Sequence, residues 1–215
     1  MSAVTPEMID YYVGLLKDVH RLNHYVSNAM FWMVVRGRAE PLTVRDIARR
    51  LDADLDMTTL RTVLERGQER TLVLEQSDHG VIMLGYNICV SASDLWDRLT
   101  KNAQAWAFGW MVNNANELLY AADGSLVTRL NVFWPEPEQC TGRDPRALDH
   151  HLGAIREIVA RRDADERAGA FDSPPYPRYP HWATALATME AMTGARLDLD
   201  RFTRKQPSIR ARGLG

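Results

Sequence analysis

Three apolar segments separated by very short turns constrain the fold of this 215-residue chain more than any other feature. The segments are residues 105–112, 116–122 and 125–133. Asn113 and Asn114 lie in the first connection and Asp123 and Gly124 in the second, and these residue types tolerate the positive φ angles of tight hairpin turns. Because connections this short join only antiparallel neighbours, the sequence predicts an antiparallel β-meander here.

A second hairpin precedes the meander. The apolar segments 71–76 and 80–90 flank a polar turn, and residues 91–103 between this hairpin and the meander have the character of a short helix. Together the two regions predict a sheet of four to five antiparallel strands within residues 69–135.

The N-terminal part of the chain, residues 1–68, predicts helices. Thr5 followed by Pro6 is a helix start, and apolar residues then recur at steps of three and four. These residues are Tyr12, Leu15, Leu16, Val19, Leu22, Val26, Ala29, Met30 and Met33. The pattern predicts a helical region, in one piece or two, that ends at Gly37.

The C-terminal part, residues 144–202, also predicts helices. One begins at Asp144-Pro145, and an amphipathic helix follows residue 180 and stops at Gly194. Residues 203–215 are basic and predict a solvated tail. The expected fold class is therefore α+β, a single domain in which helices from the N- and C-terminal segments pack on the sheet.

The stretch 42–67 has the order of a winged helix-turn-helix. A helix over 44–51, a short break and a second helix over 57–64 would be followed by the hairpin as the wing. In that interpretation Thr59, Arg61 and Arg66 would contact the major groove of DNA.

The charges near this stretch oppose DNA binding. Asp52, Asp54 and Asp56 occupy the break, close to where phosphates would lie, and Glu65 follows in the second helix. Each phosphate contact depends on positive charge. We therefore expect a pair of helices packed on the sheet, and nucleic acid as an unlikely partner.

The overall composition suggests an ordinary globular protein. Hydrophobic residues make up 46% of the chain and charged residues 25%. The formal net charge is −2, so the overall charge of the protein does not attract nucleic acid or anionic lipid. The two cysteines share no close spacing, which favours a reducing compartment. No secretory signal or membrane-spanning apolar run is visible, so the sequence predicts a cytoplasmic location.

Candidate chemical groups are few. His20 and His24 have the i, i+4 spacing of metal ligands, but no third ligand is evident, so surface histidines are the simpler interpretation. Cys140 with His150 or His151 could be imagined as a nucleophile and base, yet no oxyanion loop accompanies them. None of the common phosphate-binding, nucleophile-elbow or zinc-protease motifs is present. The expectation is a protein without catalytic residues, cofactor or metal.

Aromatic residues offer a candidate contact surface. Trp106, Phe108 and Trp110 alternate along one segment and therefore share a face of the expected sheet. With Tyr120 and Trp134 they could form either a core under the helices or a platform that binds a partner.

The region around the meander resembles a known family. The matching features are an aromatic strand that ends in Trp110, Val112 and Asn113; a strand leading to Tyr120, Ala121, Asp123 and Gly124; the residues Trp134, Pro135 and Glu136; a helix start at Asp144, Pro145, Ala147, Leu148 and Asp149; and a closing helix from Ala185 to Leu197. They are similar to an actinobacterial family of uncharacterised proteins, the domain of unknown function 6461. The likeness spans roughly residues 22 to 202, and it implies structural roles for these residues but no activity.

From these observations we expect a non-enzymatic cytoplasmic module that binds another protein, for instance an immunity or antidote-like protein. Two alternatives remain open: a DNA-binding regulator that uses residues 42–67, and an enzyme of an unrecognised type. A positive patch at Arg61 and Arg66 would favour the regulator. A polar cleft with perturbed pKa values would favour the enzyme.

Overall fold

A computed structural model describes residues 3–53, 56–65, 71–88, 93–112, 116–169 and 179–210. Its strands are β1 (Ala29–Gly37), β2 (Asp56–Arg61), β3 (Thr71–Ser77), β4 (Gly80–Tyr86), β5 (Ala103–Met111), β6 (Glu117–Ala122), β7 (Ser125–Asn131) and β8 (Gln206–Arg210). Its helices are α1 (Pro6–Leu22), α2 (His24–Ser27), α3 (Val44–Arg50), α4 (Ser93–Leu99), α5 (Gly153–Arg167), α6 (Tyr179–Thr193) and α7 (Leu199–Thr203), with 3-10 turns η1 (Pro137–Gln139) and η2 (Asp149–His151). Among the described residues no helix is both long and apolar enough to cross a membrane.

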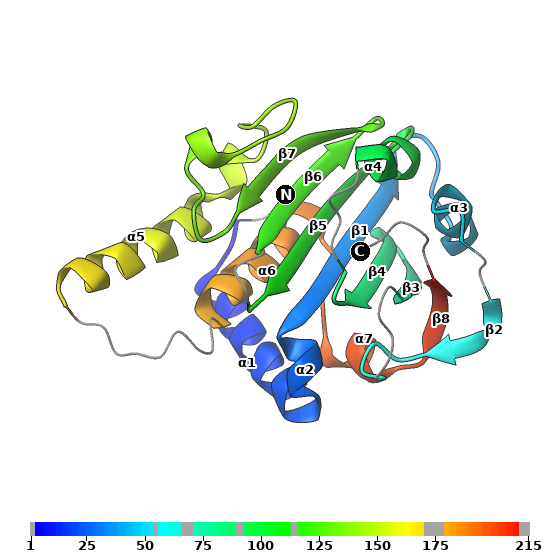
Figure 1. Ribbon diagram of the computed structural model, residues 1–215, viewed down its shortest axis with the longest axis horizontal. Helices are drawn as coiled ribbons and strands as arrows, with labels where there is room; N and C mark the ends of the chain where they lie inside the picture. Colours follow the sequence, from blue (N-terminus) through cyan, green and yellow to red (C-terminus); the bar gives the residue numbers. More distant parts are fainter. Residues whose placement is uncertain are drawn as a thin grey trace.

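The strands form one antiparallel sheet in the order β2-β8-β3-β4-β1-β5-β6-β7 (Figure 1). The α+β class is confirmed, as are the hairpin β3–β4 and the meander β5–β6–β7. The turn between β6 and β7 has the expected backbone, with φ angles of 52° at Asp123 and 78° at Gly124. The expected four to five strands are too few, because β1, β2 and β8 come from segments predicted as helix or tail.

The strand β1 corrects the prediction of a helix that continues to Gly37. The helical part ends with α2, and β1 then pairs with β4 on one side and β5 on the other. Its side chains are buried on both faces: Trp32 and Val34 point to one core, Met33 and Val35 to the other. A strand buried on both faces loses the alternation that would distinguish it from a buried helix, and this explains the error.

The described part of segment 42–67, residues 42–53 and 56–65, contains α3 and β2. Thr43 caps α3 as expected, with its hydroxyl accepting from the Asp46 amide, and Asp46 completes a capping box. The predicted helix over 57–64 is wrong, because residues 56–61 form β2, which pairs with β8. The described residues of this stretch therefore do not contain the second helix of a helix-turn-helix.

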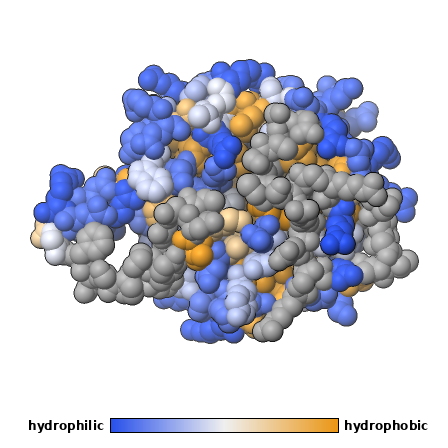
Figure 2. Space-filling view, in the orientation of Figure 1, coloured by the Kyte–Doolittle hydropathy of each residue, from blue (hydrophilic) through white to orange (hydrophobic). Residues whose placement is uncertain are grey.

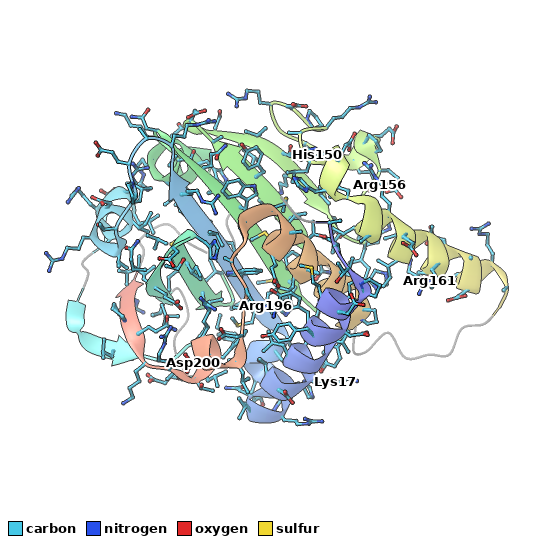
Figure 3. The ribbon with its side chains drawn as sticks, turned by 180° about the vertical axis from the view of Figure 1, so that it is seen from behind. Lys17, His150, Arg156, Arg161, Arg196 and Asp200 are labelled. Carbon is cyan, nitrogen blue, oxygen red and sulfur yellow. The ribbon has the colours of Figure 1, made fainter. Side chains whose placement is uncertain are left out.

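Helices cover both faces of the sheet. On one face α1 and α6 lie across the strands, as Figure 3 shows from behind, and they close a large core that includes Trp32, Phe108 and Trp182. On the other face α3 and α4 close a second core over the alanines of β5. The prediction that both ends of the chain supply helices to the sheet is confirmed by α1 and α6, but the sheet also has a helical layer on its opposite face.

The helix predicted from Asp144-Pro145 begins later, as α5 at Gly153. The backbone amide of Asp144 donates to Val127 of β7 at 2.9 Å, and the Thr128 hydroxyl donates to the Asp144 carbonyl at 2.6 Å. This segment is therefore held along the outer edge of the sheet, and edge pairing takes priority over the local helix signal.

The basic C-terminal segment is not a solvated tail over residues 206–210. These residues form β8, which is inserted between β2 and β3, and Ile209 is buried at 1% exposure. The charge is offset locally: Glu75 of β3 lies 3.0 Å from the Arg201 guanidinium and 2.9 Å from that of Arg204. Residues 211–215 of the predicted tail lie outside the described part of the chain.

We expect the substitution Ile209→Ala to lower the free energy of unfolding by about 2–5 kcal/mol, because it leaves a cavity against the second core. The neighbouring change Arg210→Ala, at an exposed side chain of the same strand, is the matched control and should change it by less than about 0.5 kcal/mol. Urea denaturation followed by circular dichroism measures both. Equal effects in the two variants would contradict the placement of β8 in the sheet.

Candidate functional site

Three of the five aromatic residues predicted as a contact surface belong to the core. Trp106, Phe108 and Trp110 do share one face of β5, as expected, but all three are buried beneath the helical layer. The indole of Trp110 donates to the Ser27 carbonyl at 3.0 Å, so even its polar atom is used internally. In this conformation the three side chains cannot serve as a contact surface.

The other two aromatic residues are more accessible. Tyr120 is half-buried; it stacks on Trp106 with ring centroids 5.4 Å apart, and its hydroxyl accepts from the Gln104 amide at 2.8 Å. Trp134 is 41% exposed beside the end of β7. The five predicted residues therefore do not form one platform, and Trp134 alone keeps a large exposed surface.

Of the residues predicted for DNA contact, the structure describes the side chain of Arg61. Arg61 lies at the end of β2, where its guanidinium is 3.7 Å from the Glu65 carboxylate. The side chain of Thr59 and all of Arg66 lie outside the described part of the structure.

The candidate histidines lie in pairs: the ring centroids of His20 and His24 are 6.4 Å apart, and those of His150 and His151 are 4.0 Å apart. Within the described ranges no group of three or more histidine, cysteine or acidic side chains could hold a metal ion. The His20 ring bonds to the Ser27 hydroxyl at 3.0 Å, and the Cys140 thiol donates to the Glu136 carbonyl at 3.3 Å. Burial raises the pKa of the Cys140 thiol, which favours the protonated, weakly nucleophilic form. Cys89 lies outside the described residues.

A groove lies between helices on the described surface. Its volume is about 380 Å³, and α1 and α5 form its two walls. The α1 wall consists of Pro6, Ile9, Asp10 and Val13. The α5 wall consists of Ala154, Glu157, Ile158 and Arg161. Each set has the spacing i, i+3, i+4 and i+7, so each helix turns one continuous face to the groove.

The rest of the lining comes from two short segments. Val4 and Thr5 precede α1 at one end, and Pro180 and Thr184 of α6 lie between the two walls. In Figure 3, α5 diverges from α1 and α6, with Arg161 on α5 and Lys17 on α1 marking the two arms. The groove lies where these arms come together.

The α1 wall is fixed to the body of the protein by buried polar contacts. The hydroxyl of Tyr12, which has no exposed surface, donates to the Glu190 carboxylate of α6 at 2.8 Å and accepts from the Leu197 amide at 3.2 Å. The Arg196 guanidinium bonds the same carboxylate at 3.0 Å. Burial, together with the Glu190 charge, raises the pKa of Tyr12, so the hydroxyl stays protonated.

The α5 wall is fixed at its base. Ile155 and Val159 are buried against the body, and the Arg162 guanidinium donates to the Phe133 carbonyl at 3.1 Å. Arg156 bonds Asp149, which precedes the helix, at 2.5 Å. Beyond this base α5 extends from the body as a hydrophilic arm (Figures 1 and 2). Both walls are therefore held in place by contacts within the chain.

The polar groups of the groove are almost all satisfied within the chain. The Thr5 hydroxyl accepts from the Met8 amide, and that of Thr184 donates to the Pro180 carbonyl at 2.7 Å. Glu157 pairs with Arg161 at 3.2 Å. Asp10 is exposed, and no described residue forms a hydrogen bond or ion pair with its carboxylate. The groove therefore has a mostly apolar lining with polar residues among it, and Asp10 is its carboxylate without a partner among the described residues.

Sequence reasoning missed this groove, although a signal for its α1 wall exists. The apolar stripe of Tyr12, Leu15, Leu16 and Val19 accounts for the side of α1 that faces the core. Ile9 and Val13 border this stripe and are partly buried against the same core, so they widen the apolar face of α1 toward the groove. The α5 wall gave no comparable signal, because its apolar residues are interspersed with charged ones.

Comparison with known proteins found no relative of this chain. No family model, no curated protein and no solved structure matches this chain. The resemblance to the domain of unknown function 6461 therefore stays a prediction from sequence.

The raised pKa of Tyr12 predicts a specific pH dependence of stability. The pKa of Tyr12 is higher in the folded protein than in the unfolded chain. The buried hydroxyl therefore stabilises the fold below pH 10, and this stabilisation is lost as the pH rises and Tyr12 ionises in the unfolded chain. Above about pH 10 the free energy of unfolding should fall more steeply in wild type than in Tyr12→Phe, by up to about 1.4 kcal/mol per pH unit.

Urea titrations between pH 7 and 11 measure this difference. At neutral pH the Tyr12→Phe variant should be less stable by about 1–3 kcal/mol, because Glu190 and the Leu197 amide lose their shared partner. Tyr25→Phe, at an exposed ring, controls for the removal of a tyrosine hydroxyl. If the free energy of unfolding falls equally with pH in wild type and in Tyr12→Phe, the raised pKa of Tyr12 is contradicted.

Proposed function

We propose that the protein is a non-enzymatic protein-binding module, and that it holds a segment of its partner between α1 and α5. The observation that carries this proposal is a groove whose two walls are helix faces with the spacing i, i+3, i+4 and i+7. An immunity or antidote protein, which acts by binding one target, is an example of this class.

The distribution of polar groups favours a protein partner over a small molecule. Sites for small ligands combine an apolar lining with several convergent polar groups that fix the orientation of the ligand. In this groove Thr5, Thr184, Glu157 and Arg161 are engaged within the chain, which leaves Asp10 to orient a ligand. An apolar surface of another protein needs only shape and a few charges for recognition.

The other functional interpretations have less support. A DNA-binding regulator would need the second helix over 57–64, where the chain forms β2 instead. An enzyme would need convergent reactive groups, and Cys140 forms its thiol hydrogen bond with a backbone carbonyl rather than with His150 or His151. Neither interpretation explains why α1 and α5 turn continuous faces to an open groove.

Site-specific photocrosslinking tests the proposal. With p-benzoylphenylalanine in place of Glu157, at the rim of the groove, we expect one protein of the native host to be crosslinked. The same crosslinker in place of Arg49, an exposed residue of α3 on the opposite face of the sheet, should not capture it. Equal capture at the two positions, or none at either, would rule out the groove as the contact surface.

A pair of variants on α5 then tests the purified complex. Ile158→Asp places a charge in the groove and should weaken binding at least about 10-fold in calorimetric titration, because a buried carboxylate costs more than about 1.4 kcal/mol. Ala160→Asp adds the same charge to an exposed position of the same helix, outside the groove lining, and should leave affinity within about 2-fold of wild type. Equal losses in the two variants would contradict the proposal.

A further inference from the structure

We infer that the segment bound in the groove is an amphipathic α-helix with a basic side chain opposite Asp10. This inference rests on the proposed function and specifies the partner's chemistry. It is carried by three observations: the geometry of the two walls, the state of their backbone groups and the unpaired carboxylate.

The walls suit a helix because they are themselves helices, each with a row of side chains along the groove. Residues at i, i+3, i+4 and i+7 form ridges, and the ridges of another helix pack into the grooves between them at an interaxial distance of roughly 8–10 Å. Ile9 and Val13 on α1 and Ile158 on α5 are the apolar contacts that such a helix would bury. The lining has room for the apolar side chains of about two turns, since each wall spans two turns of helix.

The backbone of the walls argues against an extended segment. A bound β-strand gains its affinity from main-chain hydrogen bonds to an exposed sheet edge. In the middle of α1 and α5 the N–H and C=O groups are used within each helix, so the walls offer side chains alone. A helix satisfies its backbone N–H and C=O groups internally, so it can bind such a surface without leaving these groups unpaired.

The charge of the groove favours a basic partner. Glu157 and Arg161 neutralise each other on α5, and Asp10 is left as the unpaired charge of the lining. The N-terminal ends of α1 and α5 add partial positive charge, but this field is confined to the first turn, and Asp10 lies beyond the first turn of α1. Glu7 in that first turn adds a second negative charge nearby.

Two synthetic peptides test the inference directly on the full chain. Both have about 15 residues, near the length at which an isolated helix becomes stable, with leucine at i, i+3, i+4 and i+7; one carries lysine and the other glutamate elsewhere. We expect the leucine–lysine peptide to bind with one-to-one stoichiometry in fluorescence anisotropy and to become helical by circular dichroism. The leucine–glutamate peptide should bind at least about 10-fold more weakly, because its charges meet Asp10 and Glu7.

Variants locate that binding. Asp10→Asn should weaken the leucine–lysine peptide about 2- to 5-fold, the range of an exposed ion pair, and Asp78→Asn, at the β3–β4 turn, should not. Ile158→Asp should weaken it at least about 10-fold, and Ala160→Asp should not. If the two members of either pair behave alike, the peptide binds elsewhere and the inference is overturned. It is also overturned if the two peptides bind equally, or if neither binds.

The failure of this inference can be distinguished from failure of the proposed function. Suppose that the native partner crosslinks at position 157 and that Ile158→Asp abolishes its binding. If its bound segment is then not helical, or if Asp10→Asn leaves its affinity unchanged, the proposed function holds and the inference of a basic helix is wrong. If no partner crosslinks and an apolar dye such as 1-anilinonaphthalene-8-sulfonate binds the groove while the peptides do not, both are wrong and the groove takes a small molecule.

Discussion

The strand β1 runs through the centre of the sheet with both of its faces buried, and the rest of the structure depends on covering those faces. Large apolar side chains on the two faces of β1, such as Trp32, stabilise the fold only if a layer of protein covers each face. The chain supplies α1 and α6 for one face and α3 and α4 for the other. Because α1 and α6 come from opposite ends of the sequence, closing the first core also fixes the N- and C-terminal parts to each other.

The groove is a consequence of that arrangement. The helix α1 is pressed onto α6 by its core stripe and by the contacts of Tyr12 with Glu190. The helix α5 meets the same layer only at its base, through Ile155 and Val159, and then diverges. Two helices anchored on one support, but not on each other along their length, leave their adjacent faces open. The groove thus arises between two helices that share one support.

The edges of the sheet show a second constraint. Along β7 the segment around Asp144 supplies backbone partners, and on the other side β8 is inserted between β2 and β3. In both places a segment with a helix-like or tail-like sequence is held by pairing with a strand: the Asp144 segment with the preceding strand β7, and β8 with strands far away in the chain. Unpaired backbone groups at a sheet edge favour such pairing, and the local sequence preference is too weak to resist it.

The sequence by itself determined the elements whose signals are local. The hairpin β3–β4 and the turn at Asp123-Gly124 depend on a few adjacent residues, and so do the Thr5 and Thr43 caps. The shared face of Trp106, Phe108 and Trp110 follows from the period of a strand, although whether that face is core or surface does not.

Only the tertiary structure decided that residues 29–37 and 56–61 are strands, that residues 206–210 enter the sheet and that α1 and α5 enclose a groove. A strand buried on both faces and a buried helix have the same apolar composition, so nothing local separates them. The pairing of β8 joins segments more than a hundred residues apart, and the groove depends on the angle between two helices. Such features arise from contacts between distant segments, which the order of residues along the chain does not display.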